Sequence, residues 1–206
     1  MDRLAKAKIR VPGLEVRVVE RCASTNALLR DDRSPYAVLL AAELQSAGRG
    51  RHGRRWHSER GAGATFSIRR TMHCEQRGLA GLSVTVGISS ARALRRLGAR
   101  GIALKWPNDL MVNRRKLGGI LIETRPAPRG ARPDQPPSGP GSVVIVGIGI
   151  NCRAQPRLGA RLSRGVASLD EVLRRAVSRN TVIGAVAGEV LDALAAWDRT
   201  AREQTA

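Results

Sequence analysis

The most apolar run of the chain is SVVIVGIGI, residues 142–150. β-branched residues dominate this run, which predicts a central, buried strand. Gly147 and Gly149 leave room there for a close backbone or a ring, although a β-bulge would use the same glycines. Asn151 follows the strand, where its amide offers a hydrogen-bond donor and an acceptor. The end of this strand is therefore a candidate binding position.

Other segments have the alternating or apolar pattern of strands. They are residues 15–20, 38–43, 64–70, 102–112 (interrupted by a turn) and 116–123. Apolar spacings of three and four predict a helix over 78–97. Capping residues predict helices that begin at Ser24, at the capping box Ser168–Glu171 and at Asn180, the last extending to Arg199.

The length of 206 residues, 42% of them hydrophobic, fits one domain with a sizeable core. No apolar run approaches the roughly 20 residues needed to span a bilayer. The N-terminal residues lack the apolar core and cleavage site of a signal peptide, so we expect a cytoplasmic protein with no membrane partner. Three scattered cysteines and three histidines without ligand spacing predict reduced thiols, and neither a disulfide framework nor a zinc site.

The chain is strongly basic, with 36 Lys and Arg against 17 Asp and Glu and a net charge of +19. Such a charge attracts polyanions, so a basic nucleic-acid-binding protein is one candidate class. Three Trp, one Tyr and one Phe are too few and too scattered for a base-stacking platform. We therefore expect no specific nucleic-acid partner.

The segment QSAGRGRHGRRW, residues 45–56, is the first candidate for a binding loop, and we call it the arginine loop. Its glycines permit positive φ and close approach of the backbone, and its arginines offer planar forks to phosphate or carboxylate. Gly48, Gly50 and Gly53 also match a dinucleotide-binding pattern, but the residues that follow do not resemble the start of the helix which that pattern requires. The loop predicts anion binding, and a solvated basic loop is the alternative.

Two further stretches place charge beside rigid or bare backbone. Lys105 and Asp109 flank a proline turn, where a cation would meet phosphate and a carboxylate would meet an amine, although a plain turn is equally compatible. Lys116 begins an apolar strand two residues before the pair Gly118 and Gly119. This predicts that the ammonium lies near glycine backbone, which has no side chain, and contacts a ligand there. The alternative is a lysine that protects a strand edge.

Four motifs occur in order along the chain: the arginine loop, KWPND at 105–109, KLGG at 116–119 and GIGIN at 147–151. With them, residues 16–198 closely resemble the catalytic domain of biotin protein ligases. The resemblance implies an α+β fold with a mixed, mostly antiparallel sheet and helices packed on one face. It also implies an ATP-dependent enzyme, a biotin–[acetyl-CoA-carboxylase] ligase. Such an enzyme activates biotin as biotinyl-5'-AMP and transfers the biotinyl group to a lysine of a biotin carboxyl carrier domain.

The resemblance also assigns roles to individual residues. Biotin binding is expected from Ser24, Thr25, Asn26, Gln45, Gly48, Arg49, Arg51, Lys116, Gly119 and Gly149. ATP or adenylate binding is expected from Arg49, Arg51, Arg54, Trp56, Lys105, Asn108, Lys116 and Asn151. Catalysis is expected from Arg51, Lys116 and Asp109, because two cations would offset negative charge and the carboxylate would orient or deprotonate the acceptor lysine. Mg2+ is implied by the polyphosphate chemistry, without a motif that fixes its ligands.

From local sequence alone, Ser24, Thr25 and Asn26 are favoured as helix-capping residues over ligand contacts. We expect residues 1–206 to form a single catalytic domain with a flexible, proline- and glycine-rich insertion at 125–141. The N-terminal segment is too short for a winged-helix DNA-binding domain, and we expect no small β-rich C-terminal domain. The sequence is compatible with a homodimer but does not determine the oligomeric state.

Three other functions remain open from the sequence. One is a degenerate ligase that binds biotin but does not complete transfer, for want of a C-terminal domain. A lipoate ligase of the same superfamily would bind lipoate in preference to biotin, and such enzymes typically have a different arginine-glycine motif. A basic nucleic-acid-binding protein would bind with a steep salt dependence and without ATP.

Overall fold

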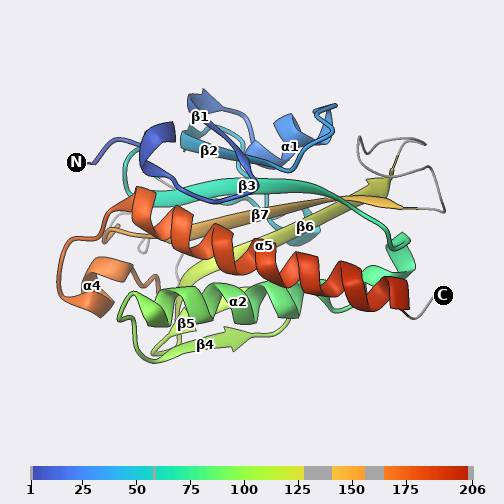
Figure 1. Cartoon of the computed structure of the whole chain (residues 1–206). Helices are drawn as coiled ribbons and strands as arrows, with labels where there is room; N and C mark the ends of the chain where they lie inside the picture. The colour runs from blue at the N-terminus through green and yellow to red at the C-terminus, as the bar shows by residue number, and fades with distance from the viewer. Residues whose placement is uncertain (1, 58, 128–140, 156–164, 204–206) are drawn as a thin grey trace.

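The computed structural model describes residues 2–57, 59–127, 141–155 and 165–203, whose named strands form one seven-stranded sheet (Figure 1). The strands are β1 (Glu15–Cys22), β2 (Val38–Gln45), β3 (Gly63–Met72), β4 (Ile102–Lys105), β5 (Asp109–Val112), β6 (Arg115–Pro126) and β7 (Ser142–Asn151). Their order across the sheet is β1-β2-β3-β7-β6-β5-β4. Only the β1–β2 pair is parallel among these strands, so the predicted mixed, mostly antiparallel α+β architecture is confirmed.

Helices lie on both faces of the sheet. They are α1 (Thr25–Arg30), α2 (Leu82–Arg96), α4 (Leu169–Leu173) and α5 (Arg179–Glu203), with short 3-10 turns η1 (Lys6–Lys8), η2 (Arg51–Gly53) and η3 (Gln76–Leu79). The long helices α2 and α5 run side by side across one face, as predicted (Figure 1). The short helix α1 packs against β2, β3 and β7 on the opposite face, so the expected packing of helices on one face holds for α2 and α5 but not for α1.

The alternation of side chains along β2 divides the core between these two faces. Leu39 and Ala41 belong to the large cluster that includes the buried residues of α2 and α5. Val38 and Leu40 join Leu29 of α1 in a smaller cluster. The central strand β7 contributes apolar side chains to both clusters, which explains why its sequence is apolar almost without interruption.

The predicted insertion at 125–141 is corrected at both ends. β6 continues through Pro126, which pairs with Ser142, and the backbone N–H of Ala127 donates to the carbonyl of Gly141 at 2.8 Å. Proline is tolerated there because it stands at the end of the strand. The remainder of the predicted insertion, residues 128–140, lies outside the described residues.

The starts and ends of three predicted helices also differ. Asn180 lies inside α5, and Ser178 precedes that helix, accepting a hydrogen bond from the backbone of Thr181 at 3.4 Å. The predicted helix over 78–97 is divided into η3 and α2 by Gly81, whose φ is +86°. The capping box at Ser168 is present, but α4 ends at Leu173 because the next residue adopts a left-handed conformation.

A buried ion pair attaches the N-terminal residues to the body of the protein. The Arg179 side chain is 1% exposed, and it donates to Oε2 of Glu43 on β2 at 2.7 Å. The Arg179 backbone N–H donates to Oδ2 of Asp2 at 2.6 Å, and Glu43 also accepts from the backbone of Leu4 at 2.5 Å. Because each buried charge has several partners, the cluster fixes residues 2–4 against β2 and α5.

Candidate ligand-binding site

Two rows of cross-strand neighbours form the floor of a hollow on the α1 face of the sheet. In the first row, Gly149 of β7 lies between Thr65 of β3 and Gly119 of β6. The next row is Ser67, Gly147 and Leu121. Directly paired residues point to the same face of a sheet. Since glycine occupies both central positions, β7 itself contributes no side chains to the floor.

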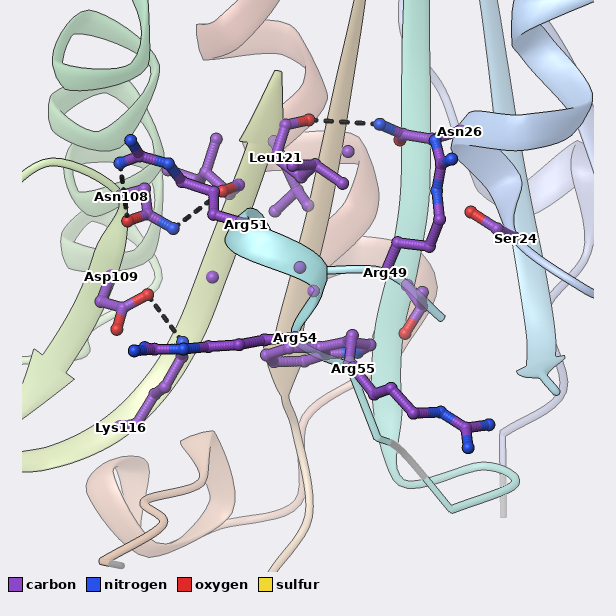
Figure 2. A pocket seen from close by; sticks show the side chains of 18 of the residues that line it. Ser24, Asn26, Arg49, Arg51, Arg54, Arg55, Asn108, Asp109, Lys116 and Leu121 are labelled. Atoms are coloured by element: carbon purple, nitrogen blue, oxygen red, sulfur yellow. Dashed lines mark hydrogen bonds and ion pairs between the residues drawn. The ribbon is translucent and has the colours of Figure 1, made fainter. Parts of the chain in front are cut away.

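A cavity of about 330 Å³ lies over this floor. Its walls come from the start of α1, the arginine loop, the turn between β4 and β5, and β6 (Figure 2). Its basic lining residues are Arg49, Arg51, Arg54, Arg55, Lys105 and Lys116. Asp109 is the one carboxylate among the described residues that line it. A cavity of this charge attracts an anionic ligand.

The start of α1 orients the amide of Gln45. The backbone N–H of Thr25 donates to Gln45 Oε1 at 2.7 Å, and the Thr25 hydroxyl lies 3.1 Å from the same oxygen. The oxygen of the amide therefore faces α1, which leaves the nitrogen as the group that can donate to a ligand. Ser24 is the N-cap of α1 and accepts from Ala27 N at 3.4 Å, so capping is confirmed and its hydroxyl hydrogen remains for a second partner.

Asn26 is almost completely buried, and both ends of its amide have protein partners. Its Nδ2 donates to Glu123 Oε2 at 2.8 Å and to the Leu121 carbonyl at 3.3 Å, and its Oδ1 accepts from Ser67 Oγ at 2.6 Å. A Cβ atom on Gly147 would lie 2.2 Å from Asn26 Oδ1, so only glycine fits beneath this side chain. The amide is fully engaged, and the predicted biotin contact of Asn26 gains no support from this arrangement.

The arginine loop forms a hairpin of its own. Trp56 N donates to the Gly48 carbonyl at 2.9 Å, and Gly50 N donates to the Arg54 carbonyl at 2.7 Å. The tip is the turn η2, where His52 and Gly53 have φ values of 53° and 70°. The described residues between the loop and β3, residues 57 and 59–62, are not helical, so they do not provide the helix that a dinucleotide-binding site requires after the three glycines.

Two arginines of the loop reach different parts of the protein body (Figure 2). Arg49 pairs with both carboxylate oxygens of Glu123 on β6. Arg51 Nη1 lies 3.4 Å from Asn108 Oδ1, and Asn108 Nδ2 donates to the Ile120 carbonyl at 3.1 Å. The loop is thus connected to β6 on one side and to the β4–β5 turn on the other.

The indole of Trp56 lies against the glycine floor. A Cβ atom on Gly149 would come within 2.3 Å of Trp56 Cε2, and a Cβ atom on Gly119 would lie 3.4 Å from Trp56 Cζ3. The glycines therefore accommodate the indole ring of Trp56, and not a ring of a ligand. The ammonium of Lys116 lies 5.9 Å from the centroid of this ring, within reach of a cation–π contact.

Lys116 and Asp109 form an ion pair at the cavity. Lys116 Nζ lies 2.6 Å from Asp109 Oδ1, with side chains 18% and 24% exposed (Figure 2). A Cβ atom on Gly119 would lie 3.4 Å from Lys116 Nζ, so the ammonium rests near bare backbone, as predicted. β6 lies between β5 and β7, which makes the alternative of an edge-protecting lysine wrong.

The backbone of Lys116 is held by a segment that precedes α4. Lys116 N donates to the Gly165 carbonyl, and Ala167 N donates to the Lys116 carbonyl, both at 2.9 Å. The Asn151 amide donates to the carbonyls of Lys116 and Ala167 at 3.2 and 3.1 Å. Asn151 therefore lies behind Lys116 and does not line the cavity, so a direct contact with ATP gains no support.

Most of the predicted site residues lie together. Ser24, Thr25, Asn26, Gln45, Arg49, Arg51, Arg54, Trp56, Lys105, Asn108, Asp109, Lys116, Gly119 and Gly149 line the one cavity. Gly48 borders a neighbouring hollow beneath the loop instead. Sequence reasoning missed Thr65, Ser67, Leu121 and Glu123. The alternation in the predicted strands 64–70 and 116–123 placed these residues on one face, but it did not show which face carried the cavity.

The described residues contain no cluster of three or more His, Cys, Asp or Glu side chains that would hold a metal ion. The three cysteines are all free thiols. Within the same residues, no helix is both long and apolar enough to cross a membrane.

The fold and the cavity define a class of protein: a single mixed sheet with a basic cavity between a glycine floor and an arginine-rich hairpin. The sequence model of the Biotin/lipoate A/B protein ligase family matches residues 18–133. The chain belongs to this family.

Known proteins of this family are similar in sequence and structure. The bifunctional ligase/repressor BirA of Escherichia coli is 34% identical over 158 residues, which are 77% of this chain and 46% of BirA. The biotin–[acetyl-CoA-carboxylase] ligase of Mycobacterium tuberculosis is 30% identical over 197 residues, which are 92% of this chain and 67% of that ligase. The chain spans less than half the length of the BirA proteins it matches.

The solved structures agree with this assignment. The biotin protein ligase from Aquifex aeolicus in complex with biotin and ATP superposes with a TM-score of 0.69 at 27% identity. The match covers 89% of this chain and 72% of the Aquifex protein. The biotin protein ligase from Leishmania major in complex with biotinyl-5-AMP, at 22% identity and a TM-score of 0.68, supports the fold alone.

Proposed function

We propose that the protein uses ATP to activate biotin as biotinyl-5'-AMP and transfers the biotinyl group to a lysine of a biotin carboxyl carrier domain. One observation carries the proposal: the Lys116–Asp109 pair lies at the edge of a glycine floor, in a cavity that the arginine loop borders. Family membership and the similarity to a ligase that binds biotin and ATP support it.

The first step joins two anions. A biotin carboxylate oxygen attacks the α-phosphorus of ATP, the bond from that phosphorus to the bridging oxygen breaks, and pyrophosphate leaves. Arg51, Arg54 and Lys116 supply positive charge where the negative charge concentrates, which lowers the barrier electrostatically. The ammonium of Lys116 is held in place before the ligands arrive, so little reorganisation is needed during the reaction.

The second step transfers the acyl group. The neutral amine of the acceptor lysine attacks the carbonyl carbon of the mixed anhydride, the bond from that carbon to the phosphate oxygen breaks, and AMP leaves. We propose that Asp109 accepts the proton lost by the amine, since its carboxylate is the one on the described cavity wall. The arginine loop would limit the access of water to the hydrolysable intermediate.

The described residues do not form a metal-binding cluster, and Asp109 is already paired with Lys116. This arrangement does not fit a Mg2+ ion held by a set of protein ligands. Mg2+ commonly binds through nucleotide phosphates and water, and we propose that it would enter with ATP in that way. No step above depends on it.

The decisive experiment is ATP-dependent biotinylation of a carrier-domain fragment, followed by mass spectrometry of the fragment. We expect the wild type to add one biotinyl group. Lys116→Ala and Arg51→Ala should each reduce the rate by about 100-fold, the typical effect of removing one preorganised charge-stabilising group. Lys8→Ala, which alters an exposed lysine outside the cavity lining, is the matched control and should leave the rate unchanged.

Two results would count against the proposal. Full turnover by both cavity variants would remove Lys116 and Arg51 from the mechanism. Transfer of lipoate in preference to biotin, measured by competition, would instead assign the protein to the lipoate branch of the family. A cytoplasmic location remains a prediction from the sequence, which does not determine the oligomeric state.

A further inference from the structure

We propose that Glu123 is a positioning residue that holds the arginine loop in place and sets the direction of the hydrogen bonds around the biotin site. The inference rests on the proposed function for its ligand, and on contacts between described residues for its geometry. Glu123 is part of β6, and it was not among the predicted site residues.

Glu123 contacts two elements that both lie far from it in the sequence. Both of its carboxylate oxygens accept from Arg49 of the arginine loop, 74 residues away, and Oε2 also accepts from Asn26 Nδ2 of α1, 97 residues away at 2.8 Å. The side chain of Glu123 is 26% exposed and that of Arg49 37% exposed. The pair borders the hollow beneath the loop, where it is partly shielded from solvent.

The contact with Arg49 anchors the hairpin beyond its base, where Ser46 N and Ala47 N donate to the Cys22 and Ala23 carbonyls at 2.9 Å. The loop holds its own shape through the hydrogen bonds between Gly48 and Trp56 and between Gly50 and Arg54. Its side-chain bonds to the strands and turns around the cavity are weaker, such as the 3.4 Å contact of Arg51 with Asn108. Among the described residues, Glu123 is the one carboxylate that pairs with an arginine of this hairpin. Loss of the Glu123 carboxylate should therefore release the hairpin from β6.

The pairing also changes the role expected of Arg49. A guanidinium that is already bound to a carboxylate offers less positive charge to an incoming anion. The neutralisation of biotin carboxylate and ATP phosphates then falls first to Arg51 and Arg54, while the ammonium of Lys116 is shared between Asp109 and the ligands. Arg49 instead keeps these groups in position by fixing the loop that carries two of them.

The contact with Asn26 determines the direction of a chain of hydrogen bonds. A carboxylate only accepts, so Asn26 must turn its NH2 group to Glu123 and its oxygen to Ser67. The Ser67 hydroxyl must then donate to Asn26, which leaves its oxygen, 2.6 Å from Thr25 Oγ1, as an acceptor. Through this chain Glu123 directs the Thr25 hydroxyl hydrogen to Ser67, so that Gln45 Oε1, 3.1 Å from the Thr25 hydroxyl oxygen, accepts from the Thr25 backbone N–H instead. The neutral ureido ring of biotin requires donors and acceptors in one fixed pattern.

The first test needs no ligand. Limited trypsin digestion followed by mass spectrometry measures cleavage after the arginines of the loop. We expect Glu123→Gln to accelerate cleavage between residues 49 and 55 by about fivefold, the effect of losing a partly exposed ion pair. The charge reversal Arg49→Glu combined with Glu123→Arg should restore slow cleavage after Arg51, Arg54 and Arg55, the sites that both variants retain. Glu189→Gln is the matched control, because it removes a carboxylate that pairs with Arg92 and Arg96 away from the cavity.

The second test measures binding of biotin and ATP by calorimetry. Glu123→Gln should raise the dissociation constant of biotin by about fivefold or more, with a smaller change for ATP and an unchanged melting temperature. A merely structural ion pair would lower the melting temperature and leave the ratio of the two affinities unchanged.

Wild-type rates of loop cleavage in Glu123→Gln would overturn the proposal, as would equal losses of biotin and ATP affinity. The tests also separate this inference from the proposed function. Wild-type protein that fails to bind biotin would refute the function, while the ligand-free digestion would still decide whether Glu123 holds the loop.

Discussion

At the scale of single residues, the floor of the cavity depends on the absence of side chains. Gly147 and Gly149 lie under Asn26 and Trp56, and a methyl group at either position would overlap with the side chain above it. Both glycines are in a regular strand, so their presence reflects close approach and not an unusual φ.

Gly149→Ala should displace the Trp56 indole from the floor, because the new Cβ atom would lie 2.3 Å from Cε2. We expect formation of biotinyl-AMP to fall by about tenfold or more, since small misplacements of a binding group reduce rates strongly. The indole is a side chain on a loop and can shift, so stability should change little. Adenylate formation and thermal unfolding measure the two effects.

The control for this variant is Gly188→Ala in α5, where no atom lies within 4 Å of the added Cβ. Alanine is a better helix former than glycine, so this variant should be stabilised by about 0.5–1 kcal/mol and remain fully active. Equal activity of the two variants would contradict a close contact between Trp56 and the floor.

At the scale of elements, the position of Lys116 is set by segments that do not touch the ligand cavity. Gly165 and Ala167 form hydrogen bonds with the backbone of Lys116. Asn151, at the end of β7, donates to the carbonyls of both Lys116 and Ala167. The strand ends and the connection before α4 thus hold the ammonium at the edge of the cavity.

Asn151→Ala should remove the side-chain donor of the buried Ala167 carbonyl and leave the Lys116 carbonyl with Ala167 N as its donor. Such a loss costs about 1–3 kcal/mol of unfolding free energy, and it should also lower kcat for adenylation by loosening Lys116. Denaturant unfolding and adenylate kinetics measure these changes.

Asn180→Ala is matched to this variant, because the Asn180 side chain is equally buried and makes two hydrogen bonds with the backbone of residues 3 and 5. Asn180→Ala should lower the free energy of unfolding by a similar amount and leave kcat for adenylation unchanged. An unchanged kcat in Asn151→Ala would show that Lys116 needs no such support.

At the scale of the whole molecule, the N-terminal residues are part of the folded body through Asp2, Glu43 and Arg179. Burial by itself raises the pKa of Asp2, but hydrogen bonds from the backbone and side chain of Arg179, together with its charge, outweigh burial and lower the pKa below its ordinary value of 3.8. A lowered carboxyl pKa stabilises the fold above pH 3.8, and this contribution is lost as the pH falls through the folded-state pKa.

Asp2→Asn should therefore be less stable than the wild type at pH 7, and the difference should shrink as the pH falls below about 4. Urea unfolding midpoints of both proteins between pH 7 and 3 measure this difference. Other carboxylates with lowered pKa values, such as Asp32, contribute equally to both proteins and cancel. A difference that does not change with pH would contradict the assigned charge interaction.

Much of the architecture followed from the sequence because strands and helices are encoded in a few consecutive residues. The apolar run at 142–150 identified the central strand, and the glycines, arginines and lysines of four motifs identified the family and most of the cavity lining. The proline content predicted that the insertion begins at residue 125. Residues 125–126 instead belong to β6, because their pairing with β7 outweighs their low strand propensity.

The tertiary structure alone decided which of these groups act on one another. The pairs Arg49–Glu123 and Asn26–Glu123 join residues that lie 74 and 97 positions apart, and Asn151 lies behind Lys116 instead of beside a ligand. Such contacts depend on the order and register of the strands. The sequence determined by itself the chemical groups and the local elements, because both are properties of neighbouring residues. Only the folded sheet, which brings distant strands into register, determined the partners of those groups.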